Sequence, residues 1–69
     1  MKLTTAINRL TKAGYEIHEG TGTYAAMKDG DTISFYETAP GSGKTGRFTF
    51  MGAESCAPTY GMTLKAAMA

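Results

Sequence analysis

The pair Asp29-Gly30 constrains the fold more than any other feature of the sequence, because it stands between two runs that alternate apolar and polar residues. Asp-Gly between such runs is the strongest short-range signal for a β-hairpin with a two-residue turn. The turn also fixes the register, so that Ala26 faces Ile33 and shares a side of the sheet with it. The sequence therefore predicts paired strands at residues 23–28 and 31–37.

Near the N-terminus, apolar residues recur with helical spacing at Leu3, Ala6, Ile7, Leu10 and Ala13. The pattern predicts an amphipathic helix of about three turns. Lys12 lies where the helix dipole favours a cation, and Gly14 suits the left-handed conformation that ends a helix. Residues 15–19 then alternate apolar and polar, which predicts the first strand.

Residues 47–51, Arg-Phe-Thr-Phe-Met, predict a fourth strand after the connection at 38–46. Thr59 is predicted to cap a short final helix in which Tyr60 and Leu64 share a side. The order is then helix, antiparallel meander of three to four strands, and helix, with both helices on one face of the sheet. This is an α+β fold, and we expect a single domain over residues 1–69.

The core has to be built with few branched aliphatic residues, since the 69 residues include 3 Leu, 3 Ile and no Val. Methionine and aromatic side chains must fill the remaining space. Strand alternation and the helix pattern predict a core of Leu10, Tyr15, Ile17, Tyr24, Ile33, Phe35, Phe48, Phe50 and Leu64. A chain of this length has room for one small core.

Charge and composition argue against several functional classes. Seven Lys and Arg against six Asp and Glu give a net charge of +1, without the basic field that nucleic-acid-binding modules use. We expect a cytoplasmic protein, because no apolar segment could span a membrane or serve as a signal peptide, and the lone Cys56 fits a reducing compartment. One Cys and one His fall short of a structural zinc site, and we expect no metal or cofactor.

The sheet face away from the helices is the candidate binding surface. Alternation assigns to it Glu16, His18, Thr23, Ala25, Met27, Thr32, Ser34, Tyr36, Thr49 and Met51. Few of these side chains are charged. Such a face is either the ordinary solvent side of an antiparallel sheet, or a surface that docks on a partner protein or on a second copy of the chain as a homodimer. The predicted contact residues are Met27, Tyr36, Lys44, Arg47 and Met51.

The segment 39–45, Ala-Pro-Gly-Ser-Gly-Lys-Thr, resembles the second half of a Walker A phosphate loop. Thr38 stands where that motif has its first glycine. A strand follows the segment, whereas the motif requires a helix whose N-terminal amides face the phosphates. We therefore expect a mobile hairpin loop here and no nucleotide site.

His18 and Cys56 are the residues that a catalytic reading would use, as general base and nucleophile. Nothing in their spacing brings them together. Glu16 and Glu19 point to opposite faces of a strand and cannot act as an acid-base pair. The sequence therefore favours a protein that is not an enzyme.

The N-terminal segment Leu3-(x)6-Leu10-Thr-Lys-Ala-Gly-Tyr-Glu-Ile17 resembles the opening of HicA-type ribonuclease toxins. The resemblance implies a double-stranded-RNA-binding-like α-β-β-β-α arrangement. That family has its catalytic histidine at the start of the second strand, where this chain has Gly20-Thr21-Gly22-Thr23. The basic start of the last helix in double-stranded-RNA-binding domains is also missing at residues 58–63. The ribonuclease activity is therefore not carried over.

The whole layout, ending in Tyr60-Gly-Met-Thr-Leu-Lys-Ala-Ala67, is similar to small proteins of phages and other mobile elements. Many such proteins inhibit host defence, anti-CRISPR proteins among them. The resemblance implies a non-catalytic module that binds and inhibits a host protein complex. One alternative is nucleic-acid binding through Lys28, Lys44 and Arg47 with a base stacked on Tyr36. The others are a HicA-like ribonuclease that lacks the family's catalytic histidine, and a weak ribonuclease or transferase that uses His18.

Overall fold

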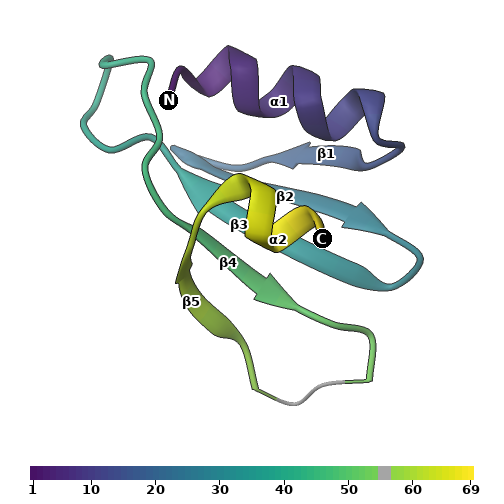
Figure 1. Ribbon diagram of the computed structural model, residues 1–69. Helices are drawn as coiled ribbons and strands as arrows, with labels where there is room; N and C mark the ends of the chain where they lie inside the picture. Colours follow the sequence, from purple (N-terminus) through teal and green to yellow (C-terminus); the bar gives the residue numbers. More distant parts are fainter. Residues whose placement is uncertain (55–56) are drawn as a thin grey trace.

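Along the chain, a helix is followed by an antiparallel meander of five strands and then by a second helix in the computed structural model, which describes residues 1–54 and 57–69 (Figure 1). The elements are α1 (Leu3–Lys12), β1 (Glu16–Glu19), β2 (Thr23–Lys28), β3 (Asp31–Tyr36), β4 (Phe48–Met51), β5 (Thr59–Met62) and α2 (Leu64–Met68). The strands are neighbours in chain order. The predicted α+β class with a helix at each end is confirmed. Neither helix, in the part of the chain described, could cross a membrane.

The hairpin of β2 and β3 has the predicted register. Ala26 faces Ile33, and Tyr24 faces Phe35. Both turn residues have positive φ, +52° at Asp29 and +85° at the glycine that follows. These angles are those of a type I′ turn, whose twist matches that of the strands.

Helix α1 ends at the glycine that the sequence indicates. Gly14 has φ +95°, and its N–H donates to the Thr11 carbonyl at 3.1 Å. The N–H of Tyr15 donates to the Leu10 carbonyl at 3.0 Å. This pair of hydrogen bonds is the Schellman motif, which satisfies carbonyls that the helix itself leaves free.

The residues that flank the hairpin turn have other partners than expected. The sequence suggests that Lys28 pairs with an aspartate of the turn, but its Nζ donates to the Ala13 carbonyl at 2.6 Å. A cation at this end of α1 is favoured by the helix dipole. The Oδ1 atom of Asp31 accepts the Ala53 N–H at 3.0 Å, which holds the end of β4 against the turn.

The C-terminal part of the prediction is wrong in one respect. Thr59 and Tyr60 lie in strand β5, and the cap of α2 is Thr63, whose Oγ1 accepts a backbone N–H at 3.2 Å. The strand forms because pairing with β4 sets Met62 opposite Phe48 and packs it against the core. The sheet therefore has one strand more than the predicted maximum, and two more than the α-β-β-β-α arrangement.

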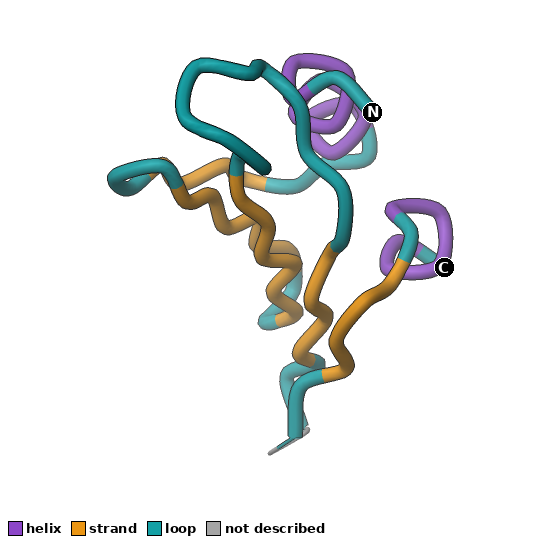
Figure 2. Tube along the Cα trace, turned by 90° about the vertical axis from the view of Figure 1, so that its left-hand side faces the viewer, coloured by secondary structure: helices purple, strands orange, loops and turns teal. Residues whose placement is uncertain are grey.

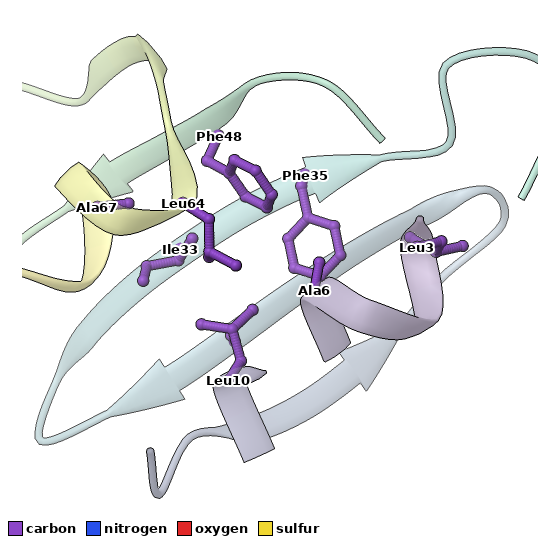
Figure 3. Packing of buried hydrophobic residues seen from close by; sticks show 9 residues of the cluster. Leu3, Ala6, Leu10, Ile33, Phe35, Phe48, Leu64 and Ala67 are labelled. Atoms are coloured by element: carbon purple, nitrogen blue, oxygen red, sulfur yellow. The ribbon is translucent and has the colours of Figure 1, made fainter. Parts of the chain in front are cut away.

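Both helices cover the same side of the sheet, and the other side is left without a helix (Figure 2). The buried cluster between the layers consists of Leu3, Ala6, Leu10, Ala26, Ile33, Phe35, Phe48, Leu64 and Ala67 (Figure 3). The rings of Phe35 and Phe48 lie 5.2 Å apart at its centre. The predicted core is confirmed, but the burial of its residues differs. Tyr15, Ile17, Tyr24 and Phe50 are only partly buried and pack against the cluster.

The connection at 38–46 is held to the N-terminus. Leu3 donates its N–H to the Gly43 carbonyl at 2.8 Å, which supplies the acceptor that the N-cap Lys2 lacks. Thr45 is 1 % exposed, and its hydroxyl donates to the Tyr36 carbonyl at 2.8 Å. The segment expected to be a mobile loop is therefore joined by hydrogen bonds both to α1 and to β3.

We predict that Thr45→Val lowers the free energy of unfolding by about 1–2 kcal/mol, because the hydroxyl that satisfies the Tyr36 carbonyl is lost without a change of shape. The matched control is Thr4→Val, on the exposed side of α1, which should change the free energy by less than about 0.5 kcal/mol. Urea unfolding followed by circular dichroism measures both. Equal effects of the two substitutions would contradict the role of Thr45.

Candidate protein-binding face

The uncovered side of the sheet presents its side chains in three rows that run across the strands. The pairing sets Glu16 beside Met27, Thr32 and Met51 in the first row, and His18 beside Ala25, Ser34 and Thr49 in the second. Thr23, Tyr36 and Arg47 form the third, since Thr23 faces Tyr36 and Arg47 lies two residues before Thr49. We call these eleven residues the open face.

The open face is hollowed where its side chains are smallest. The middle row carries the small side chains of Ala25, Ser34 and Thr49 next to His18. The hollow has a volume of about 410 Å³, and Tyr36 and Arg47 line it together with the middle row. A side chain from another molecule could therefore enter the face at this point, beside a phenol and a guanidinium.

Four of the five predicted contact residues lie on this surface. Tyr36, Met27 and Met51 are 58 %, 44 % and 42 % exposed, and they are three of the five large hydrophobic residues that are exposed in the described part of the chain. Arg47 is exposed and its guanidinium lies 3.5 Å from the Gly61 carbonyl. The structure thus brings Tyr36 and Arg47 into one hollow and both methionines into one row.

Lys44, the fifth predicted contact residue, lies apart from the open face. It belongs to the connection at 38–46, where its backbone pairs with that of Lys2. Lys28 lies on the helix side of the sheet, where its Nζ is bound to the Ala13 carbonyl. The three cations expected to bind nucleic acid therefore do not form one surface.

Strand alternation places His18 on this face, although His18 is not among the predicted contact residues. The imidazole lines the hollow and lies 3.5 Å from the Glu16 carboxylate, with both side chains largely exposed. Ser34, Thr23 and Thr49 also line the hollow. Strand alternation was the signal that could have found them, because it assigns all four residues to the same side.

The catalytic candidates do not converge among the described residues. Cys56, the proposed nucleophile, lies outside them. Glu16 faces Met27 on the open face, whereas Glu19 faces Tyr24 on the helix side, as the alternation predicts. No three His, Cys, Asp or Glu side chains in residues 1–54 and 57–69 lie close enough together to hold a metal ion.

The segment that resembles a phosphate loop has its amides occupied by a carboxylate of the same chain. Gly43 donates its N–H to Oε2 of Glu37 at 2.7 Å, and Gly41 donates to Oε1 at 3.0 Å. Both glycines have positive φ, which turns these amides toward one side. Glu37 thus lies where a phosphate would have to bind.

One ionisable group beneath the sheet has a shifted pKa. Partial burial raises the pKa of the Tyr24 phenol above its ordinary value, and the carboxylates of Glu19 and Glu37 raise it further. The Tyr24 ring is stacked on Phe35 with 5.4 Å between centroids. The neutral phenol is therefore the form that the folded protein favours.

Comparison with known proteins finds no family model, curated protein or solved structure that matches this chain. The open face offers large apolar side chains, hydroxyl groups and two opposite charges at its corners, which are the kinds of group that protein interfaces contain.

We predict that Glu37→Ala frees the Gly41 and Gly43 amides, lowers the free energy of unfolding by about 1 kcal/mol and accelerates hydrogen exchange at both amides. Glu37→Gln should have an intermediate effect, because its single carbonyl oxygen can replace one acceptor of the two. The control is Glu54→Gln, an exposed carboxylate elsewhere. Unchanged exchange at the two glycines in Glu37→Ala would show that the carboxylate does not hold the loop.

We predict that Tyr24→Phe resists alkaline unfolding better than the wild type. A phenol with a raised pKa in the folded state stabilises the fold fully below the pKa of the unfolded chain, and this contribution is lost as the pH rises through the folded pKa. Thermal unfolding from pH 7 to pH 12 measures the difference, with Tyr60→Phe at an exposed site as the control. Parallel stability profiles for wild type and Tyr24→Phe would contradict the prediction.

Proposed function

We propose that this protein is a non-catalytic interaction module that binds a partner protein through the open face. The observation that supports this most is the exposure of Met27, Tyr36 and Met51 on a sheet face without a covering helix. Exposed large apolar side chains on one uncovered face are a feature of contact surfaces. Tyrosine and methionine are also enriched at protein interfaces.

The composition of the face indicates the chemistry of the partner. The open face carries one carboxylate, that of Glu16, and one guanidinium, that of Arg47. Their opposite charges cancel in the net charge of the face. A partner surface with little net charge and one protruding apolar side chain fits, because that side chain can fill the hollow beside Tyr36. The hydroxyl groups of Ser34 and Thr49 can pair with backbone groups around it.

The most concrete form of the proposal is a phage or mobile-element protein that inhibits a host protein complex, as anti-CRISPR proteins do. Its support is the similarity in size and layout, together with the open face. Inhibition of this kind requires only that a surface of the target be occupied. A rigid sheet, with its register fixed by the Asp29-Gly30 turn, provides such a surface at low entropic cost.

Nucleic-acid binding is less well supported, because Arg47 is the lone Lys or Arg among the eleven residues of the open face. Phosphate contacts require several cations on one surface, and each contact makes the affinity depend on salt. A HicA-like ribonuclease has weaker support still. His18 lies on the edge strand β1, where it is paired with Ala25, and not at the start of β2.

We predict that Tyr36→Ala combined with Met27→Ala lowers the affinity for the partner at least tenfold, because a few exposed aromatic and apolar side chains dominate such interfaces. The partner is first identified by affinity capture from the host lysate, then purified, and its binding is titrated. The matched control is Tyr60→Ala on β5, which removes an even more exposed tyrosine that does not line the hollow.

Two outcomes would contradict the proposed function. Equal affinity of the double variant and the wild type would show that the open face is not the contact surface. A captured ligand that is removed by nuclease treatment, with affinity that falls steeply as salt is raised, would identify nucleic acid as the partner instead.

A further inference from the structure

The open face has opposite charges at opposite corners. Glu16 lies in the first row on the edge strand β1, and Arg47 lies in the third row, one residue before β4 begins. Besides these two side chains, the open face carries the imidazole of His18 in the middle row and the phenol of Tyr36 in the third row. The line that joins Glu16 and Arg47 is thus a diagonal of the face.

A two-fold rotation can make this arrangement complementary to itself. When two such faces lie against each other with the axis along the second diagonal, the rotation exchanges the corners that carry the charges. Glu16 of each copy then lies opposite Arg47 of the other, so that two ion pairs form and no like charges meet. The strands of the two sheets cross at about 90° in this arrangement, which is one of the two common ways in which sheets pack.

The groups at the two corners are free to form these pairs. Glu16 is 78 % exposed, and its contact with His18 at 3.5 Å is a long one between exposed side chains. The contact of Arg47 with the Gly61 carbonyl is equally long, at 3.5 Å. Exposed contacts of this length contribute little, so both groups can change partner at small cost.

The face is large enough for a weak interface. Strands spaced by about 4.8 Å, with six residues at about 3.4 Å each, make the four-strand face about 20 Å on each side. Counted in both copies, this is about 800 Å², which is the size of weak, transient contacts and less than that of standard protein interfaces. Met27, Met51 and Tyr36 provide the apolar area within it.

We infer that the open face is covered by a second copy of this chain in solution, and that Glu16 and Arg47 form reciprocal ion pairs across the dimer. The inference rests on the proposed function, because both use the open face. The dimer masks the surface that binds the partner, so the partner competes with self-association. The amount of binding-competent monomer then depends on the protein concentration.

The test is a charge swap measured by sedimentation over a concentration series from micromolar to millimolar. Glu16→Lys sets an ammonium group against the Arg47 guanidinium at both corners, and Arg47→Glu sets two carboxylates against each other. Each variant alone should dimerise at least tenfold more weakly than the wild type, because like charges in contact are unfavourable. An equimolar mixture of the two should form a heterodimer with wild-type affinity. At each of its two corners, an acidic side chain of one copy then lies opposite a basic side chain of the other.

Matched controls separate this effect from a change of net charge or a loss of folding. Lys65→Glu on α2 and Glu54→Lys make the same charge changes at exposed sites away from the open face, and should dimerise as the wild type does. Circular dichroism and urea unfolding establish that each variant is folded. Recovery of the dimer in the mixture is itself evidence that both single variants fold.

The results for the dimer and for the partner can be distinguished. A wild type that stays monomeric throughout, single variants that dimerise normally, or a mixture that does not recover would each overturn the dimer. The proposed function would stand in those cases if the Met27 and Tyr36 variant still lost its partner. Conversely, a dimer that responds to the charge swap supports the inference even where that variant binds the partner with full affinity.

Discussion

The packing of two short helices against one side of the sheet is the interaction on which the rest of the structure depends. Leu10 from α1 and Leu64 from α2 meet Phe35 and its neighbours in a single cluster (Figure 3). Most of the Leu, Ile, Phe and Tyr residues of the chain lie in this layer or pack against it. A second covering layer would need another set, so the opposite face is left to solvent or to another molecule. The surface available for binding is in this sense a consequence of how little core material the chain has.

The parts of the fold that follow from the sequence are those determined by neighbouring residues. The two-residue turn at Asp29-Gly30 fixes which residues of β2 and β3 face each other, and the alternation then extends to β1 and β4. Gly14 fixes the end of α1 in the same local way. The open face, with Met27, Tyr36 and Met51 exposed on it, follows directly from this register.

What could not be predicted depends on contacts between distant segments. Thr59 has the right chemistry for a helix cap, but pairing of its strand with β4 decides its conformation. Lys44 follows a glycine-rich stretch and is therefore expected on the binding surface. Its backbone instead pairs with that of Lys2, near the start of α1. The hollow was likewise not predictable, because it arises when small side chains of three strands become neighbours. Alternation gives the side on which a residue points, but not the depth of the surface there.

The position of Glu37 has a consequence for how short motifs are recognised in sequences. Its carboxylate is part of the same chain as the amides of Gly41 and Gly43, so it is present beside them at a high effective concentration. A phosphate from solution would have to displace this tethered anion before it could bind. Taken by itself, Gly-Ser-Gly-Lys-Thr suggests backbone amides that are free to bind an anion. In this chain the carboxylate of Glu37, four residues before Gly41, already accepts hydrogen bonds from them. The segment is in effect an anion-binding loop with its ligand built in.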